Sequence, residues 1–243
     1  MAVRDGQSMN GGGMIESSVA QKAMKLPAAR SVLVVCAHPD DESFGLGAAL
    51  ATFDESGTST SVVCFTHGEA STLGMDTPEL GRVRADELAA AANELGVRAV
   101  ELLHYRDGLL TEEPLGELTA RVRQAARRSG ADLLLVFDEG GITGHPDHCR
   151  ATEAAVAVAR ELELPVLAWV LPERVASALS HEFGVGFIGR ADTELDYLVS
   201  VDRARQRRAI NQHVSQATDN PVLRRRLELQ GSQEAFRWLL APS

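Results

Sequence analysis

VLVVCAHPDDE, residues 32–42, joins an apolar run to a cluster of imidazole and carboxylate side chains. The uninterrupted apolar run Val32–Ala37 is typical of a strand buried on both faces of a parallel sheet. His38, Asp40, Asp41 and Glu42 follow it directly. Ligands of open α/β sheets collect beyond the carboxyl ends of the strands. The sequence therefore predicts a metal site where this strand ends.

A second polar cluster, GHPDH at residues 144–148, follows another apolar run, Leu133–Phe137. Pro146 suits the first position of a helix, which makes His145 the expected cap and places His148 in the first turn. Asp and Pro are ordinary turn and cap residues, so one such cluster would carry little weight. Two clusters at two strand ends indicate a single site built from both.

Strand-like and helical patterns alternate from Arg30 onward. The expected strands are Val32–Ala37, Thr60–Thr66, Val100–Tyr105, Leu133–Phe137, Val166–Leu171 and Tyr197–Val201. The expected helices are Ser43–Glu55, Pro78–Leu95, Glu113–Arg128, Pro146–Leu162, Asp202–Gln212 and Gln233–Leu240, the first three of which are followed by glycine. This order predicts an α/β, single-domain Rossmann-like fold over residues 30–243, with a mainly parallel sheet flanked by helices. Residues 1–29 contain three consecutive glycines and no apolar periodicity, and are expected to form a flexible tail.

Composition excludes several classes of function. The chain has 243 residues, 44% hydrophobic and 24% charged, which permits one sizeable core. No apolar run is long enough to span a membrane and no secretory signal is evident, so a cytoplasmic protein is expected. The net charge of −10 argues against nucleic acid as a partner, because binding to phosphates requires clustered cations. Homo-oligomer formation stays open.

The residue types in the two clusters predict hydrolytic zinc chemistry. A catalytic zinc typically takes three protein ligands from His, Asp and Glu and leaves one position for water. His38, Asp41 and His148 can supply these three ligands. Asp40 is the candidate base that takes a proton from water and delivers it to a departing nitrogen. Protonated His145 is the candidate donor to the oxyanion.

Ala37–Glu42 and Gly144–His148 resemble the two signatures of the LmbE-like, or PIG-L, deacetylase family, and the resemblance extends over about residues 30–240. It implies a zinc-dependent hydrolase that removes the acetyl group from an N-acetylglucosamine-containing small molecule or glycoconjugate, with the site roles given above. It further implies that Arg84, Asp107 and His213 contact substrate. Each of these three also has an ordinary structural interpretation: a helix-surface pair with Glu87, a turn, and a cap or packing residue.

Other functions remain open at this level. One alternative is an amidase that acts on a larger acyl amide, such as a mycothiol S-conjugate or a natural product. Another is a non-catalytic carbohydrate-binding relative, since a fold does not guarantee turnover. Gly45–Leu50 has two of the three glycines of a dinucleotide-binding fingerprint and lacks the third, so a nucleotide-dependent oxidoreductase is disfavoured. The exact substrate and the physiological metal are not determined by these residues.

Overall fold

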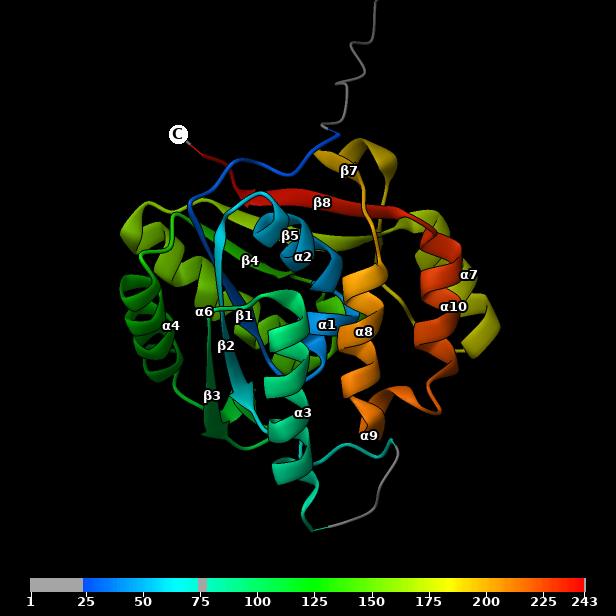
Figure 1. Ribbon diagram of the computed structural model, residues 1–243, viewed down its shortest axis with the longest axis horizontal. Helices are drawn as coiled ribbons and strands as arrows, with labels where there is room; N and C mark the ends of the chain where they lie inside the picture. Colours follow the sequence, from blue (N-terminus) through cyan, green and yellow to red (C-terminus); the bar gives the residue numbers. More distant parts are fainter. Residues whose placement is uncertain (1–23, 74–77, 243) are drawn as a thin grey trace, which may run out of the picture.

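The computed structural model describes residues 24–73 and 78–242, which build one eight-stranded sheet (Figure 1). Its strands are β1 (Ser31–Cys36), β2 (Ser59–Thr66), β3 (Ala99–Tyr105), β4 (Leu133–Phe137), β5 (Val166–Pro172), β6 (Gly189–Arg190), β7 (Tyr197–Ser200) and β8 (Gln233–Leu240). The order is β3-β2-β1-β4-β5-β8-β7, and β6 pairs with β5 off this path. Strands β1 to β5 are parallel, whereas β8 is antiparallel to both β5 and β7. The predicted α/β fold with a mainly parallel sheet is confirmed.

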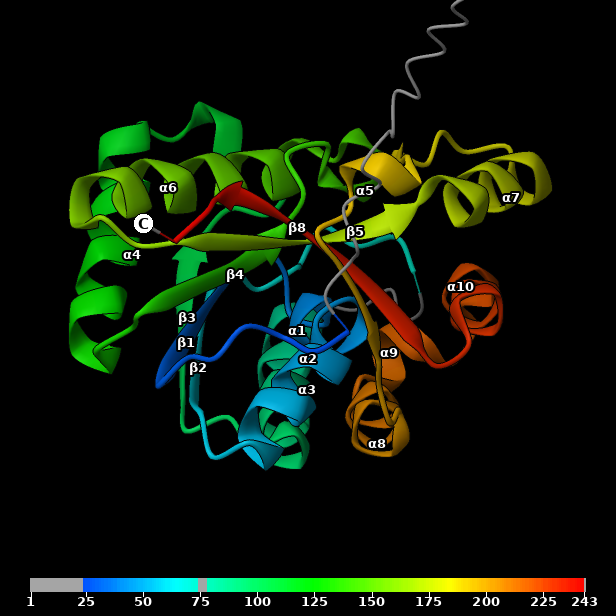
Figure 2. The same ribbon diagram turned by 90° about the horizontal axis from the view of Figure 1, so that it is seen from above.

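Helices cover both faces of the sheet, as Figure 2 shows. They are α1 (Asp41–Phe44), α2 (Gly47–Glu55), α3 (Leu80–Leu95), α4 (Leu115–Ser129), α5 (Gly141–Gly144), α6 (Pro146–Leu162), α7 (Glu173–Phe183), α8 (Ala204–Gln212), α9 (Val214–Ala217) and α10 (Pro221–Gln230), with two 3₁₀ turns at Leu110–Glu112 and Asp192–Glu194. One core cluster joins the sheet to α2, α3 and α8, and a second joins it to α4 and α6. Strands β1, β2, β4 and β5 are thus buried along almost their whole length, which explains their continuous apolar runs, whereas the edge strand β3 is mostly exposed or half-buried.

The strand order reverses between β1 and β4, which are neighbours in the sheet although β2 and β3 lie between them in the sequence. Such a reversal opens a crevice at the carboxyl ends of the two strands. The polar clusters follow these two strands, His38 after β1 and His148 after β4. The topology therefore brings residues about a hundred positions apart to one place.

The C-terminal third differs from the prediction. Gln233–Leu240, expected as a helix, is strand β8. Its residues pair with the open edge of β5 on one side and with β7 on the other. The helix-forming residues of this segment misled the prediction, because tertiary pairing overrides local preference in strands. Helices α7 and α10 were not predicted at all.

The helix predicted over Ser43–Glu55 is divided into α1 and α2 around Gly45 and Leu46. At Gly45 the chain passes so close to Phe137 that an added Cβ would lie 2.3 Å from the ring. The division leaves α1 as a single helical turn, a few residues after β1, at the crevice. This short turn carries Asp41.

The tail predicted over residues 1–29 lies mostly outside the described residues. Of its last residues, Leu26 and Ala29 pack against the core cluster on the α2 face. No helix in residues 24–73 or 78–242 combines the length and apolar character needed to cross a membrane.

Candidate metal centre and active-site cleft

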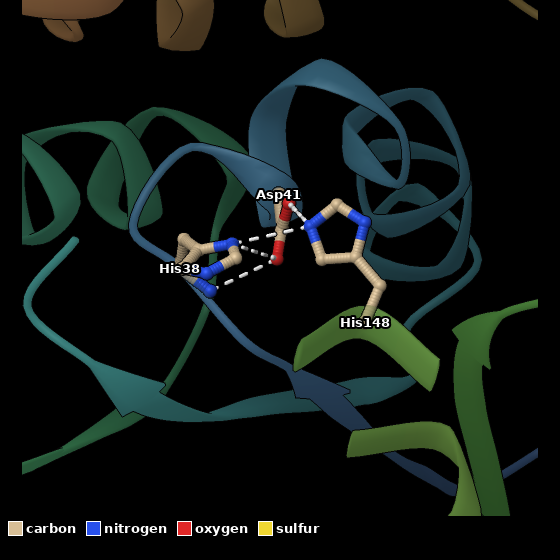
Figure 3. Close-up of side chains that lie close together, drawn as sticks. All are labelled: His38, Asp41 and His148. Atoms are coloured by element: carbon tan, nitrogen blue, oxygen red, sulfur yellow. Dashed lines mark hydrogen bonds and ion pairs between the residues drawn. The ribbon is translucent and has the colours of Figure 1, made fainter. Parts of the chain in front are cut away.

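His38, Asp41 and His148 converge at the crevice between β1 and β4 (Figure 3). His38 Nδ1 lies 3.1 Å from His148 Nε2, and His148 Nε2 lies 3.2 Å from Asp41 Oδ1. The third separation, His38 Nδ1 to Asp41 Oδ2, is 3.8 Å. Ligand atoms about 2.1 Å from one tetrahedral zinc ion are about 3.4 Å apart. The three side chains therefore have the donor types and the spacing of a three-ligand metal site.

Asp41 is held in place by the backbone that precedes it. Its Oδ2 accepts hydrogen bonds from the N–H groups of Ala37 at 3.0 Å and His38 at 2.9 Å. Burial disfavours a charged carboxylate, but His148, His38 and these hydrogen bonds outweigh it and hold the pKa of Asp41 well below its usual value. Asp41 is thus ionised and oriented, as a metal ligand must be.

The two histidines expose lone pairs to each other. His38 Nε2 is 3.0 Å from Asp107 Oδ1 and 3.3 Å from Asp147 Oδ2, so the proton of the neutral imidazole lies on Nε2. His148 Nδ1 is 3.2 Å from the carbonyl oxygen of Gly141, which places its proton on Nδ1. When both rings are neutral, the nitrogens that face each other across 3.1 Å carry lone pairs, and either a shared proton or a metal ion between them relieves their repulsion.

Carboxylates behind a ligating histidine are a recurrent feature of metal sites, since they orient the ring and raise its basicity. Burial opposes the charge of His38, but the hydrogen bonds to Asp107 and Asp147 outweigh it and raise the pKa of this imidazole well above its usual value. Asp147 is fully buried and also accepts the N–H groups of Gly108 and Leu110. Its oxygens are therefore already used, which disfavours a competing metal group made of His38, His145 and Asp147.

Asp40 adopts a backbone conformation that L-residues rarely take, with φ of 117°. Arg84 holds it there: Nη2 donates to Asp40 Oδ2 at 3.0 Å and to the carbonyl oxygen of Pro39, and Nη1 donates to the carbonyl oxygen of Gly68. Gly68 is required for this approach, because a Cβ at this position would lie 2.2 Å from the guanidinium. Strained conformations of this kind cluster at functional sites.

Burial raises the pKa of Asp40 to about 6, although the positive charge of Arg84 opposes the shift. A carboxylate of this basicity suits a general base near neutral pH. Asp40 lines the same cleft as the two histidines.

His145 caps α6 as predicted, and its Nδ1 accepts the N–H of Asp147 at 3.2 Å. The proton of the neutral ring therefore lies on Nε2, on a side chain that lines the cleft beside His148. Burial, together with His148 and His38, lowers the pKa of His145, so the neutral donor rather than the imidazolium expected from the sequence is the form that this environment favours.

The cleft has a cavity volume of about 530 Å³. Its wall includes Asp40, Arg84, Asp107, His145 and the three candidate metal ligands. His213 does not line it. That side chain is fully buried, and its Nε2 lies 2.7 Å from Glu42 Oε1.

Sequence reasoning missed two features of the site. No contact with His38 was predicted for Asp147, yet its carboxylate lies 3.3 Å from that ring, and the second histidine motif was the available signal. The C-terminal wall, which includes Asn220, Leu223 and Arg226, had no signal in the sequence because α10 was not predicted.

Comparison with known proteins decides the family. Residues 33–159, just over half of the chain, match the family model PIG-L, described as GlcNAc-PI de-N-acetylase. The chain belongs to the PIG-L family. The resemblance stated from the two motifs is thereby confirmed.

Relatives of this PIG-L protein are deacetylases. It is 30% identical to a probable N-acetyl-alpha-D-glucosaminyl L-malate deacetylase 2 of Bacillus anthracis, over 86% of this chain and 92% of that protein. It is 33% identical to the 1D-myo-inositol 2-acetamido-2-deoxy-alpha-D-glucopyranoside deacetylase of Salinispora arenicola, over 60% of this chain. The chain spans about half the length of that second relative.

The fold also recurs in a solved structure. The N,N'-diacetylchitobiose deacetylase of Pyrococcus horikoshii superimposes with a TM-score of 0.65 at 22% identity, covering 87% of this chain and 84% of that one. At this identity the likeness establishes the shared architecture of the PIG-L protein.

Proposed function

We propose that this PIG-L protein is a zinc-dependent hydrolase that removes the N-acetyl group from an N-acetylglucosamine-containing small molecule or glycoconjugate. The observation that carries the proposal is the convergence of three metal-binding side chains, a raised-pKa carboxylate and a neutral histidine in one cleft. The relatives named above support the sugar amide as the substrate class. A cytoplasmic location stays a prediction.

Zinc fits the donor set of His38 Nδ1, His148 Nε2 and Asp41, because imidazole and carboxylate in a three-ligand arrangement are typical of hydrolytic zinc sites. When bound, zinc supplies Lewis acidity, which makes water acidic enough to lose a proton near neutral pH and polarises an amide carbonyl. The protein contributes the orientation of its ligands through Asp107 and Asp147.

The remaining steps use the side chains around these ligands. Asp40 takes a proton from the attacking water as the C–O bond forms. It then delivers this proton to the amide nitrogen as the C–N bond breaks, so that acetate and a free amine leave. His145 donates its Nε2 hydrogen to the carbonyl oxygen while negative charge develops there. Arg84 binds Oδ2 of the Asp40 carboxylate, so Oδ1 stays available to take the proton.

Three residues expected to touch substrate have positioning roles in this proposal. Arg84 is 3% exposed and uses its guanidinium on Asp40 and two carbonyl oxygens. Asp107 orients His38 while bordering the cleft. His213 supports Glu42, the neighbour of Asp41, from beneath, and we propose this support in place of direct contact with substrate.

Acetate release from a panel of N-acetylglucosaminides tests the function. The zinc-loaded protein is expected to release acetate from at least one conjugate, to lose activity on chelation and to regain it with zinc. His148→Ala should be inactive, whereas His181→Ala, which alters an exposed histidine on α7, should match the unaltered protein. The panel includes one long-chain acyl amide and one mycothiol S-conjugate. Cleavage of these alone would favour an amidase, and binding without any turnover would favour a carbohydrate-binding role.

A further inference from the structure

The hydrolytic mechanism does not use all of the residues that line the cleft. Besides those with proposed roles, the wall includes Phe44, Phe137, Ile142, Phe187 and Leu223. This surface is apolar, but it also includes Arg226 of α10. In Figure 1, α10 lies with α7 at the side of the sheet beyond α8. The cation on this apolar wall requires an explanation.

Arg226 is built into the wall rather than spread over the surface. It is 6% exposed, and its guanidinium carbon lies 5.1 Å from the ring centre of Trp169. Its Nη2 donates to the carbonyl oxygen of Phe44. Phe44 ends the single turn that begins at Asp41, and one helical turn is about 5 Å long. Arg226 therefore contacts the last residue of the turn whose first residue is the ligand candidate Asp41, and both side chains line the same cleft.

The charge of Arg226 has no anionic partner among the described residues. The other arginine of the cleft wall, Arg84, pairs with Asp40. The negative charge of Glu234 favours the charged form of Arg226. The Glu234 carboxylate is already used, however, because it pairs with Arg203 and accepts the Trp169 indole N–H at 2.6 Å. A guanidinium has five N–H donors, and the structure records one hydrogen bond for this one.

Burial of an unpaired charge is costly, so buried charges are normally paired. Burial, and to a lesser extent the nearby Arg203, lowers the pKa of Arg226 to about 10, which leaves the group charged at neutral pH. The chain as a whole has a net charge of −10, so an excess of basic residues does not explain an unpaired arginine inside the cleft. Guanidinium geometry matches carboxylate and phosphate oxygens, which it binds with two parallel hydrogen bonds.

We propose that Arg226 binds an anionic group, a carboxylate or a phosphate, on the moiety joined to the sugar of the substrate. The inference rests on the proposed deacetylase function and adds a substrate class to it. The Trp169 ring against the guanidinium and the low exposure of Arg226 keep most water away from the cation, which strengthens its interaction with an anion. A conjugate with a neutral group of the same size leaves this charge unpaired and is a poorer substrate.

Three N-acetylglucosaminides of matched size test the proposal, with a carboxylate, a phosphate or a neutral hydroxyl on the attached group. The unaltered protein should have a higher kcat/KM for at least one of the anionic conjugates than for the neutral one. The ratio of kcat/KM for the carboxylate conjugate to kcat/KM for the phosphate conjugate identifies which anion the site binds. Equal kcat/KM for all three would overturn the proposal without recourse to any variant.

Arg226→Gln should lower kcat/KM for the preferred anionic conjugate by about 30-fold or more, since loss of one partner of a buried charge pair has an effect of this size. Activity on the neutral conjugate should fall much less, and this smaller loss reports the contact of Arg226 with the Phe44 carbonyl oxygen. Arg226→Lys keeps the charge but loses the planar guanidinium. Its kcat/KM for the preferred anionic conjugate should lie between those of the unaltered protein and Arg226→Gln. Arg224→Gln, an exposed arginine on the same helix, should leave all three values unchanged. An equal loss on charged and neutral conjugates would show that Arg226 only supports the fold and would overturn the proposal.

Calorimetric binding of the corresponding free-amine conjugates separates this inference from the proposed function. If no conjugate is turned over, the deacetylase proposal fails. Tighter binding of the anionic amine by the unaltered protein than by Arg226→Gln would still support the anion site. Equal affinity of both proteins for the anionic and neutral amines would reject it.

Discussion

The parallel part of the sheet and the C-terminal segment contribute to the cleft in different ways. The segments that follow strands β1 and β4 supply the residues that face the metal position, His38, Asp41 and His148. The C-terminal segment supplies no metal-ligand candidate among the described residues. Instead it supports α1: Gln206 donates to the carbonyl oxygens of Ser43 and Phe44, and Arg226 also donates to that of Phe44.

His213 completes this support through its contact with Glu42. Side chains from α8, from the α8–α9 junction and from α10 thus all hold the turn that carries Asp41. The proposed chemistry therefore resides in the segments after the parallel strands, whereas support of α1 and the proposed anion contact reside in the C-terminal segment. Variants after the parallel strands should therefore lose turnover or zinc binding, whereas variants in the C-terminal segment should lose stability or substrate preference.

The largest effect is expected at the strand-end chemistry. Asp40→Asn should lower kcat by about 10²- to 10⁴-fold, because general-base catalysis contributes about this much. Zinc content, measured on the same sample, should stay at the level of the unaltered protein. Unchanged turnover with full zinc content would show that Asp40 is not the base.

A C-terminal variant should lose stability first. His213→Ala breaks a fully buried pair with Glu42, and removal of one partner of such a pair costs about 3–5 kcal/mol. Denaturant unfolding of the apo-protein measures this loss, with His181→Ala as the control for an exposed histidine. If His213→Ala unfolds at the same midpoint as the control but loses catalysis, direct contact of His213 with substrate would be the better interpretation.

Asp147→Asn tests whether the Asp147 carboxylate orients the His38 ring for metal binding. The variant should bind zinc about 10- to 100-fold more weakly, the usual effect of removing a carboxylate behind a ligating histidine. Competition with a chelator gives the affinity, and the exposed Asp219→Asn serves as the matched control. An affinity equal to that of the control would assign the orientation of His38 to Asp107 alone.

The smallest effect is expected at the start of α10. Asn220 Oδ1 accepts the N–H of Leu223 at 2.9 Å and caps the helix that carries Arg226. Asn220→Ala should destabilise the protein by about 1 kcal/mol, whereas Asn220→Ser should retain most of the cap. Equal stability of the Ala and Ser variants in denaturant unfolding would show that packing of α10, not its cap, determines its position.

The parallel half was readable because its signals are local and agree with each other. Apolar runs, glycine stops and the cap at His145 each follow from a few neighbouring residues, and α6 begins at Pro146 and ends at Leu162 as predicted. The prediction failed where a distant partner decides the conformation. Gln233–Leu240 becomes a strand because β5 offers an open edge, and the single turn α1 is delimited where Phe137 packs against Gly45.

The sequence by itself determined the α/β fold, the family and the candidate ligands His38, Asp41 and His148, because motif and strand end are adjacent in the chain. Only the tertiary structure decided how the surrounding charges are used. It placed Asp147 and Asp107 behind His38, Arg84 against Asp40 and His213 beneath Glu42. It also left Arg226 without an anionic partner among the described residues of the cleft. Charge pairing depends on distance and burial in space, and neither is encoded in the spacing of residues along the chain.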